Sequence, residues 1–82
     1  MLTRDRLIKL HFEEREMLGQ IYFESNGFIL KPELGKWLFC AEHDGYIIAT
    51  MLWIETELEL ATIYYQSTQK NLYLIKNTDS NE

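Results

Sequence analysis

The sequence predicts an α+β fold in which one long N-terminal helix packs on a three- to four-stranded antiparallel β-meander. Between residues 3 and 24, apolar side chains recur at every third or fourth position, which is the spacing of one face of an α-helix. After residues 31–35 the apolar spacing changes to two, and the pair Asp44-Gly45 separates two strand-like runs.

The predicted helix over residues 3–24 has recognisable ends. Thr3 is a residue type that caps helix N-termini, and Asp5 falls in the first turn, where the helix dipole favours an acid. Asn26-Gly27 follows the last apolar position and is a common helix stop. These signals agree with the apolar spacing and favour one long helix.

A second interpretation of this segment stays open, because Gly19 weakens a helix by about 1 kcal/mol relative to alanine. In that interpretation the helix ends near Gly19, and residues 21–25 and 28–31 form a hairpin around the Asn-Gly pair. The apolar run that continues through Leu18 and Ile21 favours the long helix.

The clearest local prediction is a β-hairpin formed by residues 37–43 and 46–54. A two-residue turn fixes its facing pairs, which include His43 with Tyr46, Cys40 with Ala49, and Trp37 with Leu52. The second strand is apolar on both faces, which predicts a strand that is central or covered on both sides.

The remaining chain completes the predicted sheet and the domain. Residues 58–66 are predicted to form a third strand, and residues 72–76 a fourth. Residues 1–76 are expected to form a single compact domain, because the chain of 82 residues is of one-domain size and 46% of it is apolar. Residues 77–82 contain no apolar side chain and are predicted to be a disordered tail.

The composition predicts a cytoplasmic protein that binds neither nucleic acid nor a membrane directly. The formal net charge is −5, which disfavours contact with phosphate backbones and anionic lipids. Cys40 is the only cysteine, so no internal disulfide can form, and a reducing compartment is expected. The longest apolar run, Tyr46–Ile54, is too short for a helix that crosses a bilayer.

No catalytic residue, metal ligand or cofactor is predicted, and the chain is not expected to be an enzyme. Cys40 and His43 are three positions apart on a strand, so their side chains project to opposite faces and cannot share a metal or a proton. His11 is predicted to be a half-buried histidine at the edge of the helix's apolar face. The glycines are isolated from one another, so the chain has no dinucleotide-binding or P-loop motif.

The predicted interaction surface is acidic. Residues 37–69 contain no lysine or arginine, but they hold five acidic residues: Glu42, Asp44, Glu55, Glu57 and Glu59. The last three alternate, so on a strand they would share one face, with neighbours about 7 Å apart. We expect all five to contribute to binding a basic protein partner.

Two aromatic residues complete the candidate partner-binding set. Trp53 and Tyr65 stand close in sequence to the alternating glutamates, and Trp and Tyr are over-represented at interface hot spots. The predicted function is therefore a small acidic module that modulates or inhibits a basic, nucleic-acid-binding type of partner. Small anti-defence inhibitors carried by phages and mobile elements share its size, its acidity and its lack of catalytic motifs.

An alternative function is a homo-oligomeric structural or assembly subunit. One helix covers only one face of a sheet, so the apolar second face of Tyr46–Ile54 would be buried in a homodimer. Sedimentation distinguishes this alternative from the binding module.

A third hypothesis comes from a partial resemblance to a known family. Residues 39–50, Phe-Cys-Ala-Glu-His-Asp-Gly-Tyr-Ile-Ile-Ala-Thr, and the later Ile63-Tyr64-Tyr65 resemble the central strands of Gcn5-related N-acetyltransferases. The resemblance implies a reduced acyltransferase-like domain. Residues 66–71 stand where that family has its glycine-containing phosphate-binding loop, and no glycine follows Gly45, so acetyl-coenzyme A is not assigned as a cofactor.

Overall fold

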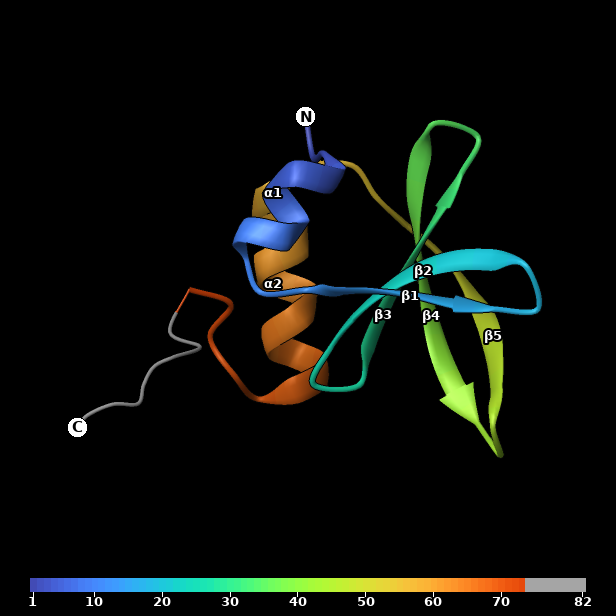
Figure 1. Cartoon of the computed structure of the whole chain (residues 1–82). Helices are drawn as coiled ribbons and strands as arrows, with labels where there is room; N and C mark the ends of the chain where they lie inside the picture. Colours follow the sequence, from blue (N-terminus) through green and yellow to red (C-terminus); the bar gives the residue numbers. More distant parts are fainter. Residues whose placement is uncertain (74–82) are drawn as a thin grey trace.

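The computed structural model describes residues 1–73 and consists of one antiparallel sheet with two helices on the same face (Figure 1). The strands lie side by side in chain order, β1 to β5, as a five-stranded meander. The elements are α1 (Arg4–Lys9), β1 (Glu13–Met17), β2 (Gln20–Ser25), β3 (Phe28–Glu33), β4 (Lys36–His43), β5 (Tyr46–Ile54) and α2 (Glu57–Thr68).

The long N-terminal helix predicted over residues 3–24 is wrong. Thr3 does cap a helix, but α1 ends at Lys9, and His11 has a φ of 72°, which an α-helix cannot contain. Leu18 and Gly19 also have positive φ, at 53° and 79°, and form the turn between β1 and β2. The apolar spacing of three and four residues therefore predicts a helix correctly only in α1. The same spacing in β1 and β2 is a coincidence, because these segments are strands.

The alternative hairpin around Asn26-Gly27 is the correct interpretation of this segment. Asn26 and Gly27 have φ values of 52° and 82°, and Ser25 faces Phe28 across the turn. Positive φ at both central residues is the geometry of a type I′ turn, which matches the twist of the flanking strands. Burial along the inner part of β2 alternates, as expected when one face of a strand meets the core.

The hairpin predicted around Asp44-Gly45 is confirmed as β4 and β5, and Cys40 faces Ala49 as expected. Beyond Cys40 the predicted register is wrong, because a bulge between Phe39 and Cys40 shifts the pairing, and Trp37 faces Ile54. The two unpaired positions of the opposite strand are Thr50 and Met51.

The third strand predicted over residues 58–66 is also wrong, because this segment is helix α2. Thr56 and Glu59 form a capping box that begins the helix, and Gln69 ends it in the left-handed conformation. The Ile63-Tyr64-Tyr65 segment that resembled an acetyltransferase strand is therefore helical. Of the predicted fourth strand, residues 72 and 73 are not in a strand, and the rest lies outside the described residues, as does the predicted tail at 77–82.

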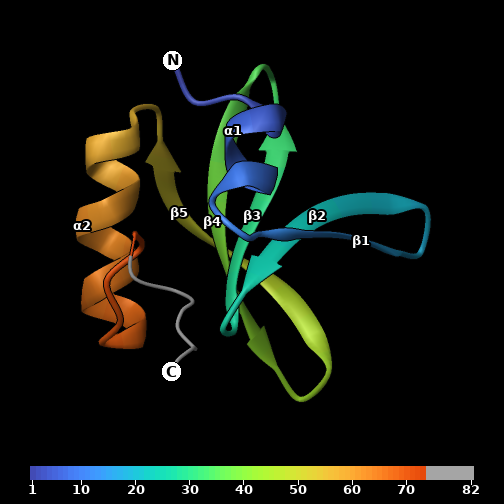
Figure 2. The ribbon, with the colours of Figure 1, turned by 60° about the vertical axis from the view of Figure 1, so that its left-hand side comes forward.

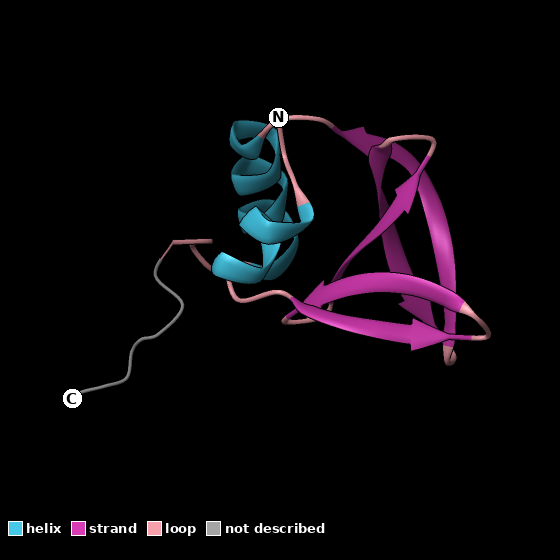
Figure 3. Cartoon of the chain, turned by 45° about the horizontal axis from the view of Figure 1, so that its top comes forward, coloured by secondary structure: helices cyan, strands magenta, loops and turns pink. Residues whose placement is uncertain are grey.

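The main core lies between the sheet and the two helices, which Figure 3 shows gathered on one side of the strands. The core consists of Leu2, Leu7, Leu10, Phe12, Phe23, Phe28, Leu30, Ile54, Leu60, Tyr64 and Leu72. Phe28 stacks on Phe39 with 4.5 Å between ring centroids and meets Tyr64 edge-on at 5.2 Å. These ring contacts join the middle of the sheet to α2.

The opposite face of the sheet carries a smaller apolar cluster, and neither α1 nor α2 covers it. Ile29, Leu38 and Cys40 are buried there, and Tyr22 and Ile47 pack against them. We call this surface the open face.

The sheet divides at its open face, because β2 and β3 pair only near their shared turn. Beyond that region β2 pairs with β1 alone, and β3 pairs with β4 alone. The β1–β2 hairpin therefore diverges from the β4–β5 hairpin, as Figure 2 shows.

Candidate functional site

The acidic residues predicted to bind a partner do not form one surface, because the half-buried Glu57 is paired with Arg6 of α1. Arg6 donates from Nε to Glu57 Oε1 at 2.7 Å and from Nη2 to Oε2 at 3.0 Å. The Tyr73 hydroxyl donates to the same Oε2 at 2.7 Å. The hydrogen bonds from Arg6, followed by that from Tyr73, lower the pKa of Glu57 to about 2. Glu57 thus holds α1, α2 and the segment after α2 together.

The Glu59 carboxylate is also used in hydrogen bonds within the protein. Its Oε1 accepts hydrogen bonds from the backbone N–H groups of Glu55 at 2.9 Å and Thr56 at 3.0 Å. The Thr56 hydroxyl in turn accepts from the backbone N–H of Glu59 at 3.1 Å. These backbone hydrogen bonds lower the pKa of Glu59. The alternating glutamates therefore serve mainly as parts of a helix start, and the predicted row on one strand face does not exist.

The other three predicted acids lie at the two ends of β5. Glu42 and Asp44 are exposed near the β4–β5 turn, where Asp44 Oδ2 lies 3.4 Å from His43 Nε2. Glu55 follows the other end of β5, and its carboxylate lies 3.8 Å from Lys36 Nζ. These carboxylates are exposed to solvent and open to a partner.

The two predicted aromatic residues lie on different faces of the molecule. Trp53 faces Leu38 across the β4–β5 pair and so belongs to the open face, whereas Tyr65 is on α2, which covers the other face. Both are partly exposed, but only Trp53 is part of β5. Of the predicted residues, Glu42, Asp44, Glu55 and Trp53 lie on β5 or close to its ends.

The two edges of the sheet differ in the length and charge of their strands. Edge strands of natural sheets are usually protected by charged side chains, proline or short length. β1 follows this rule, since it has five residues of which four are charged. β5 breaks it, since it has nine residues and none is charged.

The apolar side chains of β5 are also exposed. Tyr46 is 71% exposed and Met51 is 84% exposed, and Ile48, Leu52 and Trp53 are exposed as well. The sequence predicted that this strand, apolar on both faces, is central in the sheet or covered on both sides. Its position at the edge changes the meaning of the pattern, because exposed contiguous apolar surface marks interaction sites.

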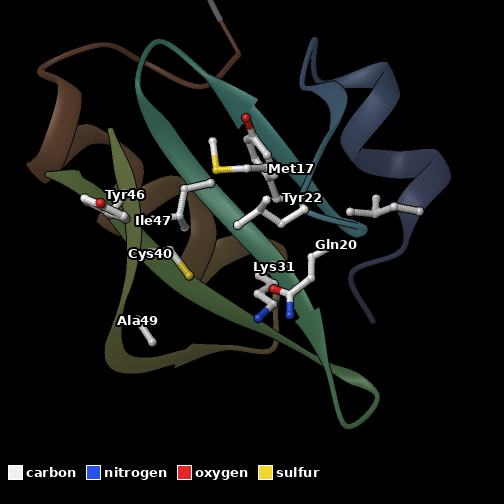
Figure 4. A pocket seen from close by; sticks show the side chains of 10 residues that line it. Met17, Gln20, Tyr22, Lys31, Cys40, Tyr46, Ile47 and Ala49 are labelled. Carbon is white, nitrogen blue, oxygen red and sulfur yellow. The ribbon is translucent and has the colours of Figure 1, made fainter. Parts of the chain in front are cut away.

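A groove runs along the open face beside β5. It has a volume of about 310 Å³ and separates the β1–β2 hairpin from the first half of β5 (Figure 4). Met17, Tyr22, Ile47 and Ala49 are among the side chains that line it, with Cys40 at its base. Burial raises the pKa of the Cys40 thiol, so the groove holds a protonated, unreactive sulfur.

The polar chemistry of the described residues does not suggest a metal site. Residues 1–73 contain no group of three or more His, Cys, Asp or Glu side chains placed to hold a metal ion. Cys40 is buried under the groove, whereas His43 is exposed at the β4–β5 turn. Neither described helix has the length and apolar character that crossing a bilayer requires.

Comparison with known proteins gives no match: no protein-family model fits the sequence, and no curated protein or solved structure is similar to it.

Proposed function

We propose that this protein is a non-catalytic binding module that attaches to a basic protein through β5 and the acidic residues at its two ends. The observation that carries the proposal is that β5 is a long, uncharged and exposed strand at an edge of the sheet. An edge of this kind is a template for pairing with another chain, and its exposed apolar side chains become favourable contacts once water is excluded.

The acids at the ends of β5 favour a basic partner. Glu42 and Asp44 stand before the strand and Glu55 stands after it, so negative charge lies at each end of β5. The net charge of −5 adds long-range attraction for a positively charged partner and repels an acidic one. Glu57 and Glu59 contribute to this field but not to direct contacts, because their carboxylates are bound within the fold.

The biological role that fits this binding mode is modulation or inhibition of the partner. A basic surface that recognises nucleic acid would be masked by an acidic domain seated on it, as in the phage or mobile-element type of inhibitor. We place this interaction in the cytoplasm, because Cys40 is a free thiol.

The proposal is tested by one substitution on β5 with a matched control. Ile48→Lys puts a cation on the exposed strand, which should repel a basic partner and prevent strand pairing. Leu34→Lys makes the same chemical change at the β3–β4 turn, where Leu34 is 89% exposed. Both variants and the wild type would be immobilised and exposed to extract from the source cells, at low and at high salt.

The expected result is a set of basic proteins retained by the wild type and by Leu34→Lys at low salt, released at high salt, and absent with Ile48→Lys. Retention that is unchanged by Ile48→Lys would show that β5 is not the binding surface. Retained proteins that are mostly acidic would contradict the electrostatic part of the proposal.

Self-association through β5 is a second candidate function, favoured by the same uncharged strand. Two copies can meet along β5 without bringing like charges together within the strand. Pairing the strands antiparallel would, however, bring the acidic ends of the two copies near one another, which costs energy. Sedimentation at micromolar concentration tests it: a dimer that Ile48→Lys converts to a monomer would support self-association, whereas a wild-type monomer would exclude it.

A further inference from the structure

The first half of β5 has backbone groups directed away from its neighbour. The turn at Asp44-Gly45 has two residues with positive φ, so the closing pair, His43 with Tyr46, is a hydrogen-bonded pair of the ladder. Hydrogen-bonded and non-hydrogen-bonded pairs alternate along an antiparallel ladder. The N–H and C=O groups of Ile47 and Ala49 therefore point outward, and among the described residues no further strand lies beyond them.

The bulge limits this accessible edge to residues 46–49. Thr50 donates from Oγ1 to the carbonyl oxygen of Phe39 at 2.7 Å, and Met51 has a φ of 70°. A β-bulge bends the strand and commonly ends regular pairing. Residues 52–54 resume the ladder with β4 beyond this irregularity.

The groove lies on the same side as the side chains of Ile47 and Ala49, which both line it. In an antiparallel pair, facing residues direct their side chains to the same face of the sheet. Side chains of an added strand that face Ile47 and Ala49 would therefore point toward the groove, where Met17 and Tyr22 form the opposite wall.

We infer that residues 46–49 accept an extended segment of the basic partner as a sixth, antiparallel strand, with apolar side chains anchored in the groove. This inference rests on the proposed function and names the binding mode of the same surface. Antiparallel addition continues the arrangement of every pair already in the sheet, and backbone hydrogen bonds with alternate side-chain anchoring are typical of strand addition.

The direction of the added strand determines where its charges lie. In antiparallel addition the C-terminal end of the segment lies beside the start of β5, next to Asp44 and Glu42. The partner segment should therefore have two or more alternate apolar residues followed, toward its C-terminus, by lysine or arginine. A parallel arrangement would require the basic residues to come first.

The test selects ligands from a library of random twelve-residue peptides displayed on phage, with the full-length protein as the target. We expect enriched peptides to carry an apolar alternating run with lysine or arginine on its C-terminal side. Enrichment of acidic peptides, of peptides with the reversed order, or of none above background would overturn the inference.

Two variants separate the backbone contribution from the charge contribution. Ala49→Pro removes an outward N–H that β4 does not use, and proline is tolerated at such edge positions, so the fold should remain while peptide affinity falls by about tenfold or more. Asp44→Asn keeps a good type I′ turn residue but removes the charge, so affinity should fall less and become less sensitive to salt. Unchanged affinity in Ala49→Pro, with its circular dichroism intact, would exclude strand addition.

Amide hydrogen exchange of the peptide complex gives an independent readout. The amides of Ile47 and Ala49 should become protected on binding, whereas those of Tyr46 and Ile48 already pair with β4 and should change little. If a partner binds and Ile48→Lys abolishes binding, but Ile47 and Ala49 stay unprotected, the proposed function holds and the strand-addition mode is wrong. If Ile48→Lys has no effect on any binding, both are wrong.

Discussion

Arg6 donates hydrogen bonds to both carboxylate oxygens of Glu57 and thereby connects α1 to the first turn of α2. The arginine and the Tyr73 hydroxyl together favour the ionised form of Glu57 and lower its pKa from the ordinary value of 4.5 to about 2. Because the folded-state pKa is the lower one, this contribution to stability is present above about pH 4.5 and is lost as pH falls toward about 2.

Replacing Glu57 with glutamine should therefore lower the free energy of unfolding at neutral pH, and the difference from the wild type should disappear on acidification. Urea unfolding of both proteins from about pH 7 down to about pH 2 measures this difference. Glu55→Gln is the control, since Glu55 makes only a 3.8 Å contact with Lys36 on the surface and should matter little at any pH. A Glu57→Gln effect that persists at the acid end would mean that lost packing, and not charge, is responsible.

The capping box at the start of α2 gives a second prediction. Thr56→Ala removes the hydroxyl that accepts from the backbone N–H of Glu59 and should lower the free energy of unfolding by about 1 kcal/mol. Glu59→Gln should be tolerated, because glutamine also fits the capping-box position. Urea midpoints measure both changes. Equal losses in the two variants would contradict the prediction that glutamine can replace Glu59 in the capping box.

The β-hairpins illustrate what could be predicted from local sequence. Asp44-Gly45 was sufficient to identify β4 and β5, because both residue types tolerate the positive φ that the turn requires. The same geometry recurs at every hairpin, and the four turn glycines stand eight, eight and ten residues apart. This regular spacing was the available signal for a five-stranded meander. It was missed because Leu18 and Leu34, which precede two of these glycines, are not typical turn residues.

The helix predictions failed for a different reason. Apolar residues at helical spacing continued past α1, but the chain leaves the helix at His11, which has a positive φ. Histidine tolerates this conformation better than most residues, but a single histidine does not predict a helix end. In α2 the reverse occurred: the capping-box pattern of Thr56 and Glu59 was the available signal for a helix in the segment that was predicted to be a strand.

The candidate site depended on information that local sequence lacks. The absence of charge from β5 was visible, but whether the strand lies at the centre or the edge depends on how many strands precede it. The groove depends on the separation of β2 from β3, which no local pattern indicates.

Tyr64 links α2 to the β2–β3 turn through its hydroxyl and supplies a third prediction. The hydroxyl lies 2.9 Å from Ser25 Oγ and accepts from Asn26 Nδ2 at 2.7 Å, and both Tyr64 and Ser25 are buried. Tyr64→Phe keeps the ring but leaves the serine hydroxyl without this partner, so the free energy of unfolding should fall by about 1 to 2 kcal/mol. Tyr65→Phe, on the exposed side of α2, is the matched control and should be neutral. Equal stability of the two variants would argue against the buried hydrogen bonds.

The bulge in β5 gives the last prediction, through Met51. Its φ of 70° is unfavourable for a residue with a Cβ, by roughly 1–2 kcal/mol, and its side chain is 84% exposed, so little packing compensates. Met51→Gly relieves this strain, but it also raises the conformational entropy of the unfolded chain. The two effects oppose each other, so the free energy of unfolding should stay within about 1 kcal/mol of the wild type. Met51→Val retains the strain and adds a branched Cβ, so it should be less stable than Met51→Gly.

Ile48→Val is the control, because it places valine on the same strand at a position with ordinary strand geometry. Thermal or urea unfolding of the three variants gives the comparison. If valine is tolerated at position 51 as well as at position 48, the backbone at Met51 does not hold a positive φ in solution. The strand would then run regularly past Thr50, and the accessible edge of β5 would extend over its whole length instead of ending at Ala49.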